Sequence, residues 1–189
     1  MPLTASAELE RIALRGCIPL TVQLELTAHC NHACTFCYKP TAPRAEELQT
    51  GEVLELLDTL ARMGALYLQL TGGEPTLRPD FRAIAERARD NHFALSLSTN
   101  GSTLDQETAS WIAALPFASV QISLLAAGPG LHDQLVRSPG SFSSTTVTSS
   151  AIATHASNVR VSPPAIRPSH APNFASRPCA APIAPAAAG

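Results

Sequence analysis

Long hydrophobic runs are missing from this 189-residue chain, and so is any excess of positive charge. No stretch of 18 apolar residues occurs, so the sequence predicts no membrane-spanning helix. Residues 1–20 lack a continuous apolar segment and carry both glutamates and arginines, which argues against a secretory signal peptide. The formal net charge of −2 offers no basic surface, so nucleic acid is not an expected partner.

Acidic residues are missing from the last part of the chain, because no Asp or Glu follows residue 140. Ala, Ser, Thr and Pro dominate there, and no apolar period of 2 or 3.6 residues persists. Such a segment buries too little apolar surface to offset the entropy lost on ordering. We therefore expect a folded part over residues 1–142 and a disordered Pro-, Ala-, Ser- and Thr-rich tail over residues 143–189.

The abrupt change near residue 142 also suggests that the tail is translated out of frame. The patterned part stops where a helix should begin, and the tail is rich in residues with GC-rich codons. Lysine is nearly absent as well, since Lys39 is the single lysine among 13 lysine and arginine residues. Another reading frame downstream of the Phe142 codon should then encode a strand–helix pattern. An ordinary Pro/Ala-rich linker or tail is the alternative.

Three cysteines stand close together in the run C-x3-C-x2-C, at Cys30, Cys34 and Cys37. Three thiolates on one loop can hold three corners of an iron–sulfur cube and leave the fourth iron without a protein ligand. A structural zinc site normally has four ligands, and His29 or His32 would then supply the fourth. The spacing favours iron–sulfur and leaves zinc open.

A second motif, Gly72-Gly73-Glu74-Pro75, follows an apolar run over residues 65–70, with Thr71 between them. Paired glycines let the backbone approach a ligand closely or adopt a positive φ. A carboxylate at the end of the strand suits an ammonium group. The alternative is a plain strand-to-helix turn in which the proline ends the strand.

Strand-like and helix-like segments alternate over the first 140 residues, as in a parallel α/β barrel or open sheet. The chemical motifs lie at the carboxyl ends of the predicted strands, where such folds place their sites. Predicted strands cover residues 22–26, 65–70, 93–98 and 119–124, and predicted helices cover 50–63, 79–91 and 105–115.

Taken together, these motifs resemble the signature of the radical S-adenosylmethionine (radical SAM) enzymes over about residues 18–142. The aromatic residues Phe36 and Tyr38 beside the last cysteine fit that pattern, as do the Gly-Gly-Glu motif and two later strand ends. His132-Asp133 and residues 137–142 resemble the "HD…R…PGSF" stretch of the peptide- and cofactor-maturing (SPASM-type) branch. The implied fold is α/β, a partial parallel TIM-like barrel with about four of six βα units present.

The resemblance implies that Cys30, Cys34 and Cys37 hold a [4Fe–4S] cluster that binds S-adenosylmethionine. Reductive cleavage of this cofactor would give a 5′-deoxyadenosyl radical that abstracts hydrogen from a substrate, a peptide by the branch resemblance. No protein side chain is implied as a catalytic acid or base. The residues implied to contact the cofactor are Phe36, Tyr38, Gly72, Gly73, Glu74, Pro75, Ser98, Asn100 and Ser123.

The same resemblance implies a low-potential electron donor, a flavodoxin or a ferredoxin, and a cytoplasmic location for the oxygen-sensitive cluster. We expect His29 and His32 to be solvated loop residues, with a hydrogen bond near the cluster as the alternative, and His132-Asp133 to orient a loop. Two other interpretations compete with the enzyme: an inactive fragment and a non-catalytic metal-binding module.

Overall fold

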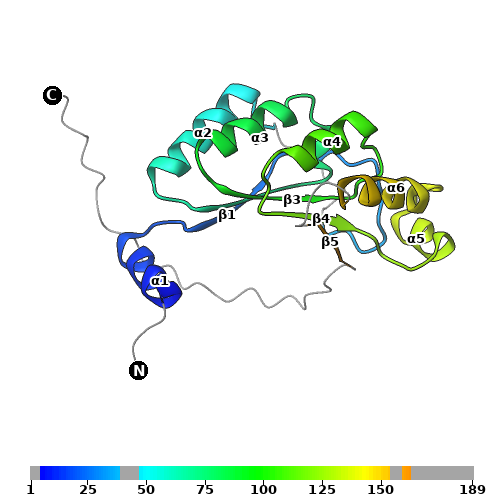
Figure 1. The fold of residues 1–189 in the computed structure, drawn as a ribbon, viewed down its shortest axis with the longest axis horizontal. Coiled ribbons are helices and arrows are strands. Elements are labelled where there is room, and N and C mark those ends of the chain that lie inside the picture. Colours follow the sequence, from blue (N-terminus) through cyan, green and yellow to red (C-terminus); the bar gives the residue numbers. More distant parts are fainter. Residues whose placement is uncertain (1–4, 39–46, 154–158, 163–189) are drawn as a thin grey trace. The chain divides into compact units, whose positions relative to one another are not determined.

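The computed structural model describes residues 5–38, 47–153 and 159–162 (Figure 1). The chain divides into two compact units. One of them contains the N-terminal helix α1 (Ala5–Gly16). The other, residues 18–165, contains all the other described elements and every predicted site residue.

A five-stranded parallel sheet forms the centre of the second unit, in the order β1-β2-β3-β4-β5. Because every pairing is parallel, the carboxyl ends of the strands lie at the same edge of the sheet. In the register, Leu24 lies beside Leu70, and Leu70 beside Leu97. The strands are β1 (Thr21–Glu25), β2 (Tyr67–Thr71), β3 (Ala94–Thr99), β4 (Ser119–Ser123) and β5 (Val159–Ser162).

Helices α2, α3 and α4 lie over one face of the sheet, and α6 contacts β4, β5, α4 and α5 (Figure 1). Their apolar sides meet the alternate aliphatic residues of the strands, which forms the core. Fully buried members of this core include Leu57, Leu68, Leu70, Ile84, Leu97, Ile112 and Ile122. The helices are α2 (Thr50–Arg62), η1 (Pro75–Leu77), α3 (Phe81–Asp90), α4 (Gln106–Ala114), α5 (Pro129–Val136) and α6 (Ser141–Ala153).

The opposite face of the sheet is polar. Side chains alternate between the two faces of a strand, so the residues between the buried aliphatic ones share this second face. They are half-buried amides and hydroxyls, namely Gln69, Ser96, Ser98, Gln121 and Ser123. In a partial barrel this face is the interior, and it offers hydrogen-bonding groups to a polar ligand.

The predicted elements up to residue 124 are confirmed. Each of the four strands and three helices is present, and its bounds differ from the predicted ones by at most two residues at either end. The open parallel sheet with helices on one face agrees with the predicted partial barrel.

Order continues beyond residue 142, where the sequence predicted a disordered tail. Helix α6 runs to Ala153 and β5 adds a fifth strand where about four were expected. The helix has no apolar period because hydroxyl side chains form much of its inner side. Those hydroxyls donate hydrogen bonds to backbone carbonyls: Thr145 to that of Asn100 (3.0 Å) and Ser149 to that of Thr145 (2.7 Å). The rest of the predicted tail, residues 154–158 and 163–189, lies outside the described residues.

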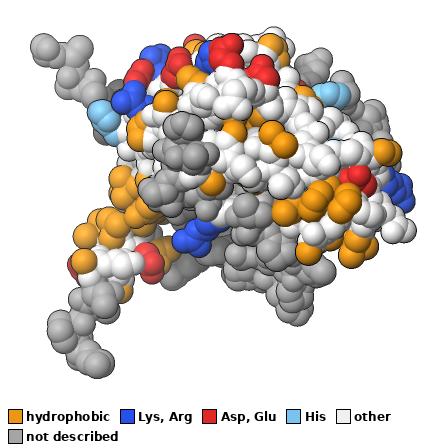
Figure 2. All heavy atoms as spheres, turned by 45° about the vertical axis from the view of Figure 1, so that its right-hand side comes forward, with side chains coloured by type: hydrophobic (Ala, Val, Ile, Leu, Met, Phe, Trp, Pro, Cys, Tyr) orange, Lys and Arg blue, Asp and Glu red, His pale blue; other side chains and the backbone are white. Residues whose placement is uncertain are grey.

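Charged side chains gather on the helix-covered side. Figure 2 shows Lys/Arg and Asp/Glu side chains together along the upper side, where α2, α3 and α4 lie in Figure 1. Arg82 pairs with Glu107 across α3 and α4 (3.1 Å), and Arg87 pairs with Asp58 across α3 and α2 (3.0 Å). Such exposed pairs stabilise little but join neighbouring helices. Within the described parts of the chain, none of the helices has the length and apolar composition needed to cross a bilayer.

Candidate functional site

The three predicted metal ligands lie on the segment that follows β1, which we call the cysteine loop (residues 26–38). Cys30, Cys34 and Cys37 are free thiols, the first two half-buried and the third exposed. Burial raises the pKa of the Cys30 and Cys34 thiols, and neighbouring thiols raise it further. The described residues contain no group of three or more His, Cys, Asp or Glu side chains arranged around a single metal ion.

The Gly72-Gly73 pair packs against the backbone of the cysteine loop. A Cβ at Gly72, where φ is +143°, would lie 2.6 Å from the Thr27 carbonyl oxygen, and one at Gly73 would lie 2.1 Å from the His29 carbonyl oxygen. The Gly73 N–H donates to Thr27 (2.7 Å) and the Glu74 N–H donates to His29 (2.8 Å). The glycines are therefore required because the loop backbone occupies the space of a side chain. The sequence suggested close approach to a ligand, and the structure shows close approach to the loop.

Glu74 is fully buried and accepts hydrogen bonds from three neighbours. Thr76 donates its N–H (3.2 Å) and hydroxyl (2.6 Å), Thr99 its hydroxyl (2.7 Å) and Asn100 its N–H (2.7 Å). Burial raises the pKa of this carboxyl, and the four donors oppose the rise. Both carboxyl oxygens are occupied by the protein, so Glu74 joins the end of β2 to the end of β3. Pro75, also buried, begins η1 directly after it.

Asn100 lies beside the first cysteine. Its amide nitrogen donates to Asn31 (2.8 Å) and points at the Cys30 sulfur at 3.9 Å. Its amide oxygen accepts from the Ser102 N–H (2.9 Å) and hydroxyl (2.8 Å). The Cys30 sulfur also receives the backbone N–H of His32 at 3.4 Å. Sequence reasoning missed Asn31 and Ser102, because an asparagine inside the motif and a serine after a strand carry no signal without the tertiary contact.

His32 is a bonded and half-buried residue, which corrects the prediction of a solvated side chain. Its Nε2 lies 3.0 Å from the hydroxyls of Ser102 and Ser141. The Ser141 hydroxyl also lies 3.3 Å from Nε2 of the buried His132, whose Nδ1 accepts the N–H of Leu125 (3.1 Å). Burial lowers the pKa of both histidines, so we assign the neutral forms. Because Nδ1 of neutral His132 accepts a hydrogen bond, its Nε2 carries the proton and donates to Ser141.

Asp133 orients the following loop, as predicted. Its two carboxylate oxygens accept the backbone N–H groups of Gly140 (2.6 Å) and Phe142 (2.8 Å). These bonds lower the pKa of Asp133. They also fix the turn that leads into α6 and presents Ser141 to the histidines.

Two backbone hydrogen bonds tie the cysteine loop to the end of α5. The Ala33 N–H donates to the Val136 carbonyl (3.1 Å), and the Thr35 N–H donates to the Leu135 carbonyl (2.9 Å). They use carbonyls at the helix C-terminus, which have no partner within the helix. The segment between the first and third cysteines therefore rests on α5.

The other predicted cofactor residues lie around the same end of the sheet. Ser98 and Ser123 are half-buried at the ends of β3 and β4 on the polar face. Phe36 is 48% exposed and Tyr38 is 71% exposed. The Tyr38 hydroxyl donates to Glu25 at the end of β1 (2.6 Å). The structure thus brings the cysteines, the glycine turn and the polar strand ends to one edge.

Comparison with known proteins gives consistent matches. A profile of the radical SAM superfamily matches residues 24–145. Mycofactocin maturase of Mycobacterium tuberculosis is 38% identical over 125 residues, which are 66% of this chain and 32% of that protein. GTP 3′,8-cyclase of Haemophilus influenzae is 35% identical over 120 residues, 60% of this chain and 35% of that protein. The chain spans about a third of the length of these curated relatives.

Solved structures share the fold. SuiB of Streptococcus suis bound to the precursor peptide SuiA superposes with a TM-score of 0.69 at 16% identity, covering 82% of this chain and 36% of that one. The protein anSMEcpe with bound S-adenosylmethionine gives a TM-score of 0.64 at 18% identity, covering 76% and 43%. At such identities the likeness establishes the architecture, a partial parallel α/β barrel.

Proposed function

The chain belongs to the radical SAM superfamily, and from this we propose that its cysteine loop holds a [4Fe–4S] cluster that binds S-adenosylmethionine. The observation that carries the proposal is the loop itself. Three free thiols stand on one short segment, and its backbone is paired with the Gly-Gly-Glu turn. Three thiolates fit this group because they leave one iron of the cube without a protein ligand. The amino and carboxylate groups of the cofactor would bind at that iron.

When bound, the cluster and S-adenosylmethionine would supply one-electron radical chemistry for abstracting a hydrogen atom from the substrate. The chain's own residues hold and tune this centre. The His32 N–H and the Asn100 amide lie at the Cys30 sulfur. Donors to a ligating sulfur stabilise the thiolate and adjust the reduction potential of a cluster.

The proposed cofactor contacts come from four parts of the site. The backbone of the glycine turn faces the amino group, and the buried Glu74 holds that turn rather than contacting the ligand itself. Hydroxyl and amide groups at the ends of β3 and β4 face the ribose and carboxylate, and the exposed aromatic residues after Cys34 pack on the adenine. The proposed contact residues are Phe36, Tyr38, Gly72, Gly73, Ser98, Asn100 and Ser123, and Glu74 and Pro75 are proposed to hold the turn beside the cofactor.

We propose a peptide as the substrate class. The support is that mycofactocin maturase is among the relatives, and that SuiB and anSMEcpe have been solved with bound peptides. A flavodoxin or ferredoxin would supply the electron. An oxygen-sensitive cluster suits a reducing compartment, for which we propose the cytoplasm.

Anaerobic reconstitution tests the proposal. The wild-type chain should bind about four iron and four sulfide per chain, with visible absorbance, and Cys34→Ala should lose that absorbance. With a chemical reductant and S-adenosylmethionine, the reconstituted chain should release 5′-deoxyadenosine, measured by chromatography. Zinc bound in place of iron would establish a metal-binding module, and a chain that binds neither metal would be an inactive fragment.

A further inference from the structure

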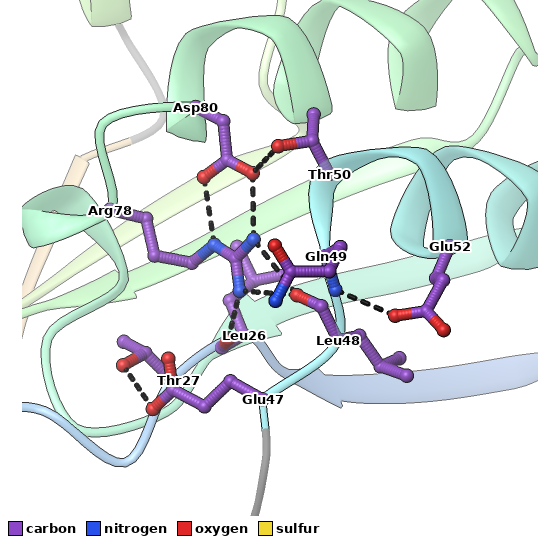
Figure 3. Close-up of polar contacts among 9 residues, drawn as sticks. All are labelled: Leu26, Thr27, Glu47, Leu48, Gln49, Thr50, Glu52, Arg78 and Asp80. Carbon is purple, nitrogen blue, oxygen red and sulfur yellow. Dashed lines mark hydrogen bonds and ion pairs between the residues drawn. The ribbon is translucent and has the colours of Figure 1, made fainter.

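One arginine contacts both ends of the segment that carries the three cysteines. This segment leaves the sheet at Leu26, after β1, and returns at Leu48, before α2. Arg78 donates from Nη1 to the Leu26 carbonyl (2.8 Å), and from Nη1 and Nη2 to the Leu48 carbonyl (3.2 Å each). Figure 3 shows the guanidinium between the two carbonyls. The two ends are thus held together by one side chain.

Asp80 fixes the orientation of that guanidinium. Its carboxylate accepts Arg78 Nε (2.8 Å) and Nη2 (2.6 Å) in a two-pronged pair, and it also accepts the hydroxyl of Thr50 (2.7 Å). The two side chains are only 10% and 14% exposed. An arginine has five N–H donors, and each of them has an acceptor here. A lysine could not reproduce this planar fork.

A second contact closes the same base of the loop. One carboxylate oxygen of Glu47 accepts the hydroxyl of Thr27 (2.7 Å) and the N–H of Ala28 (2.8 Å). Glu47 thereby holds the residues just after Leu26, and Arg78 holds the carbonyl just after Glu47 (Figure 3). Holding the ends of a loop together removes the loop-closure part of the chain entropy that opposes its ordering.

We propose that Arg78 and Asp80 are positioning residues that close the base of the cysteine-bearing segment, so that its thiols are held in place before a cluster binds. The proposal rests on the proposed function, because only cluster binding gives a reason to hold the thiols in place. Its physical claim, that the pair orders residues 26–38, concerns the chain without a cluster. Neither residue touches the cysteines, so their effect is carried by the backbone at the two ends of the segment.

Hydrogen exchange on the full chain without a cluster gives the direct test. Arg78→Met should raise amide exchange in residues 26–38 by about tenfold or more, because several hydrogen bonds to a charged group are lost. Exchange in β3 should stay at the wild-type rate. Arg78→Lys should recover only part of the protection, since it keeps the charge without the fork. The control is Arg82→Met, which removes an exposed ion pair between α3 and α4 and should change neither segment.

Anaerobic reconstitution gives the second readout. Arg78→Met should hold several-fold less iron per chain than Arg82→Met, and the electron paramagnetic resonance signal of its reduced cluster should broaden. Wild-type exchange in residues 26–38, or wild-type iron content with an unchanged signal, would overturn the proposal. If Arg78→Met also loses protection in β3, the same measurements are made on Asp80→Asn. Wild-type exchange in residues 26–38 or wild-type iron content in that variant would overturn the proposal. A wild-type chain that binds no iron–sulfur cluster would refute the proposed function, while the exchange result would still decide the role of Arg78.

Discussion

Replacing Gly73 with alanine should separate the glycine turn from the cysteine loop. The added Cβ would lie 2.1 Å from the carbonyl oxygen and 2.6 Å from the carbonyl carbon of His29. Both atoms belong to the backbone, so no side-chain rotation relieves the clash. The loop or the turn must move by more than about 1 Å to restore an ordinary van der Waals separation.

The cost of this movement follows from what it disrupts. Forcing one extra carbon into a closely packed site typically costs about 1–3 kcal/mol. The hydrogen bonds from the Gly73 and Glu74 N–H groups to the loop, at 2.7 and 2.8 Å, would lengthen or break, and each contributes about 1 kcal/mol. We expect a loss near 3 kcal/mol, which corresponds to a fall in Tm of roughly 6–12 °C for a chain of this size.

Thermal melting of the chain without a cluster measures that loss, and visible absorbance after reconstitution measures its effect on the site. The matched control is Gly51→Ala on α2, where an added Cβ meets no atom within 4 Å. There the substitution should stabilise the helix by about 0.5–1 kcal/mol. A Gly73→Ala chain that melts with the wild type and assembles a full cluster would refute the packing argument.

Three other changes are informative. Glu74→Gln should destabilise the chain by about 1–3 kcal/mol in urea unfolding, because an amide nitrogen would face a buried N–H donor; unchanged stability would contradict the bonded-carboxylate role. The neighbouring arginine lowers the pKa of Asp80 from 3.8 to about 2. Wild-type stability should therefore fall by about 2 kcal/mol more than that of Asp80→Asn between pH 4 and pH 2, and parallel curves would exclude this linkage. Ser141→Ala should cost about 1–3 kcal/mol by leaving the buried His132 without its acceptor, whereas Ser144→Ala on the exposed side of α6 should cost little; equal effects would argue against the histidine contact.

The framework of the fold was predictable because apolar alternation and helix periodicity are properties of short segments. Residues 65–70, followed by two glycines, indicated a buried strand with a loop at its carboxyl end, and β2 confirms it. Helix α6 was not predictable in the same way. Its inner side carries Thr145 and Thr148, whose hydroxyls donate to carbonyls of the segment after β3. A hydrophobicity pattern treats such residues as polar and finds no buried face.

The positions of the thiols could be predicted from spacing, but their surroundings could not. His32 contacts Ser141 across 109 residues of chain, and Arg78 contacts Leu26 across 52. No local pattern marks either pair, because each depends on how the strands are aligned in the sheet. The packing of the glycines against the loop was not predictable for the same reason. Their partner is the backbone of the cysteine loop, which the sequence places more than forty residues away.

The long separation between His32 and Ser141 has a consequence for synthesis. A ribosome adds about 5–20 residues per second, so the cysteines leave it roughly 5–20 s before the serine that completes their surroundings is made. A parallel sheet also forms slowly, since each strand pairs with one that lies far along the chain. The nascent thiols therefore spend this interval without their finished setting. On the proposed function, we expect a cluster to bind more firmly to the completed chain than to a nascent chain that ends before α6.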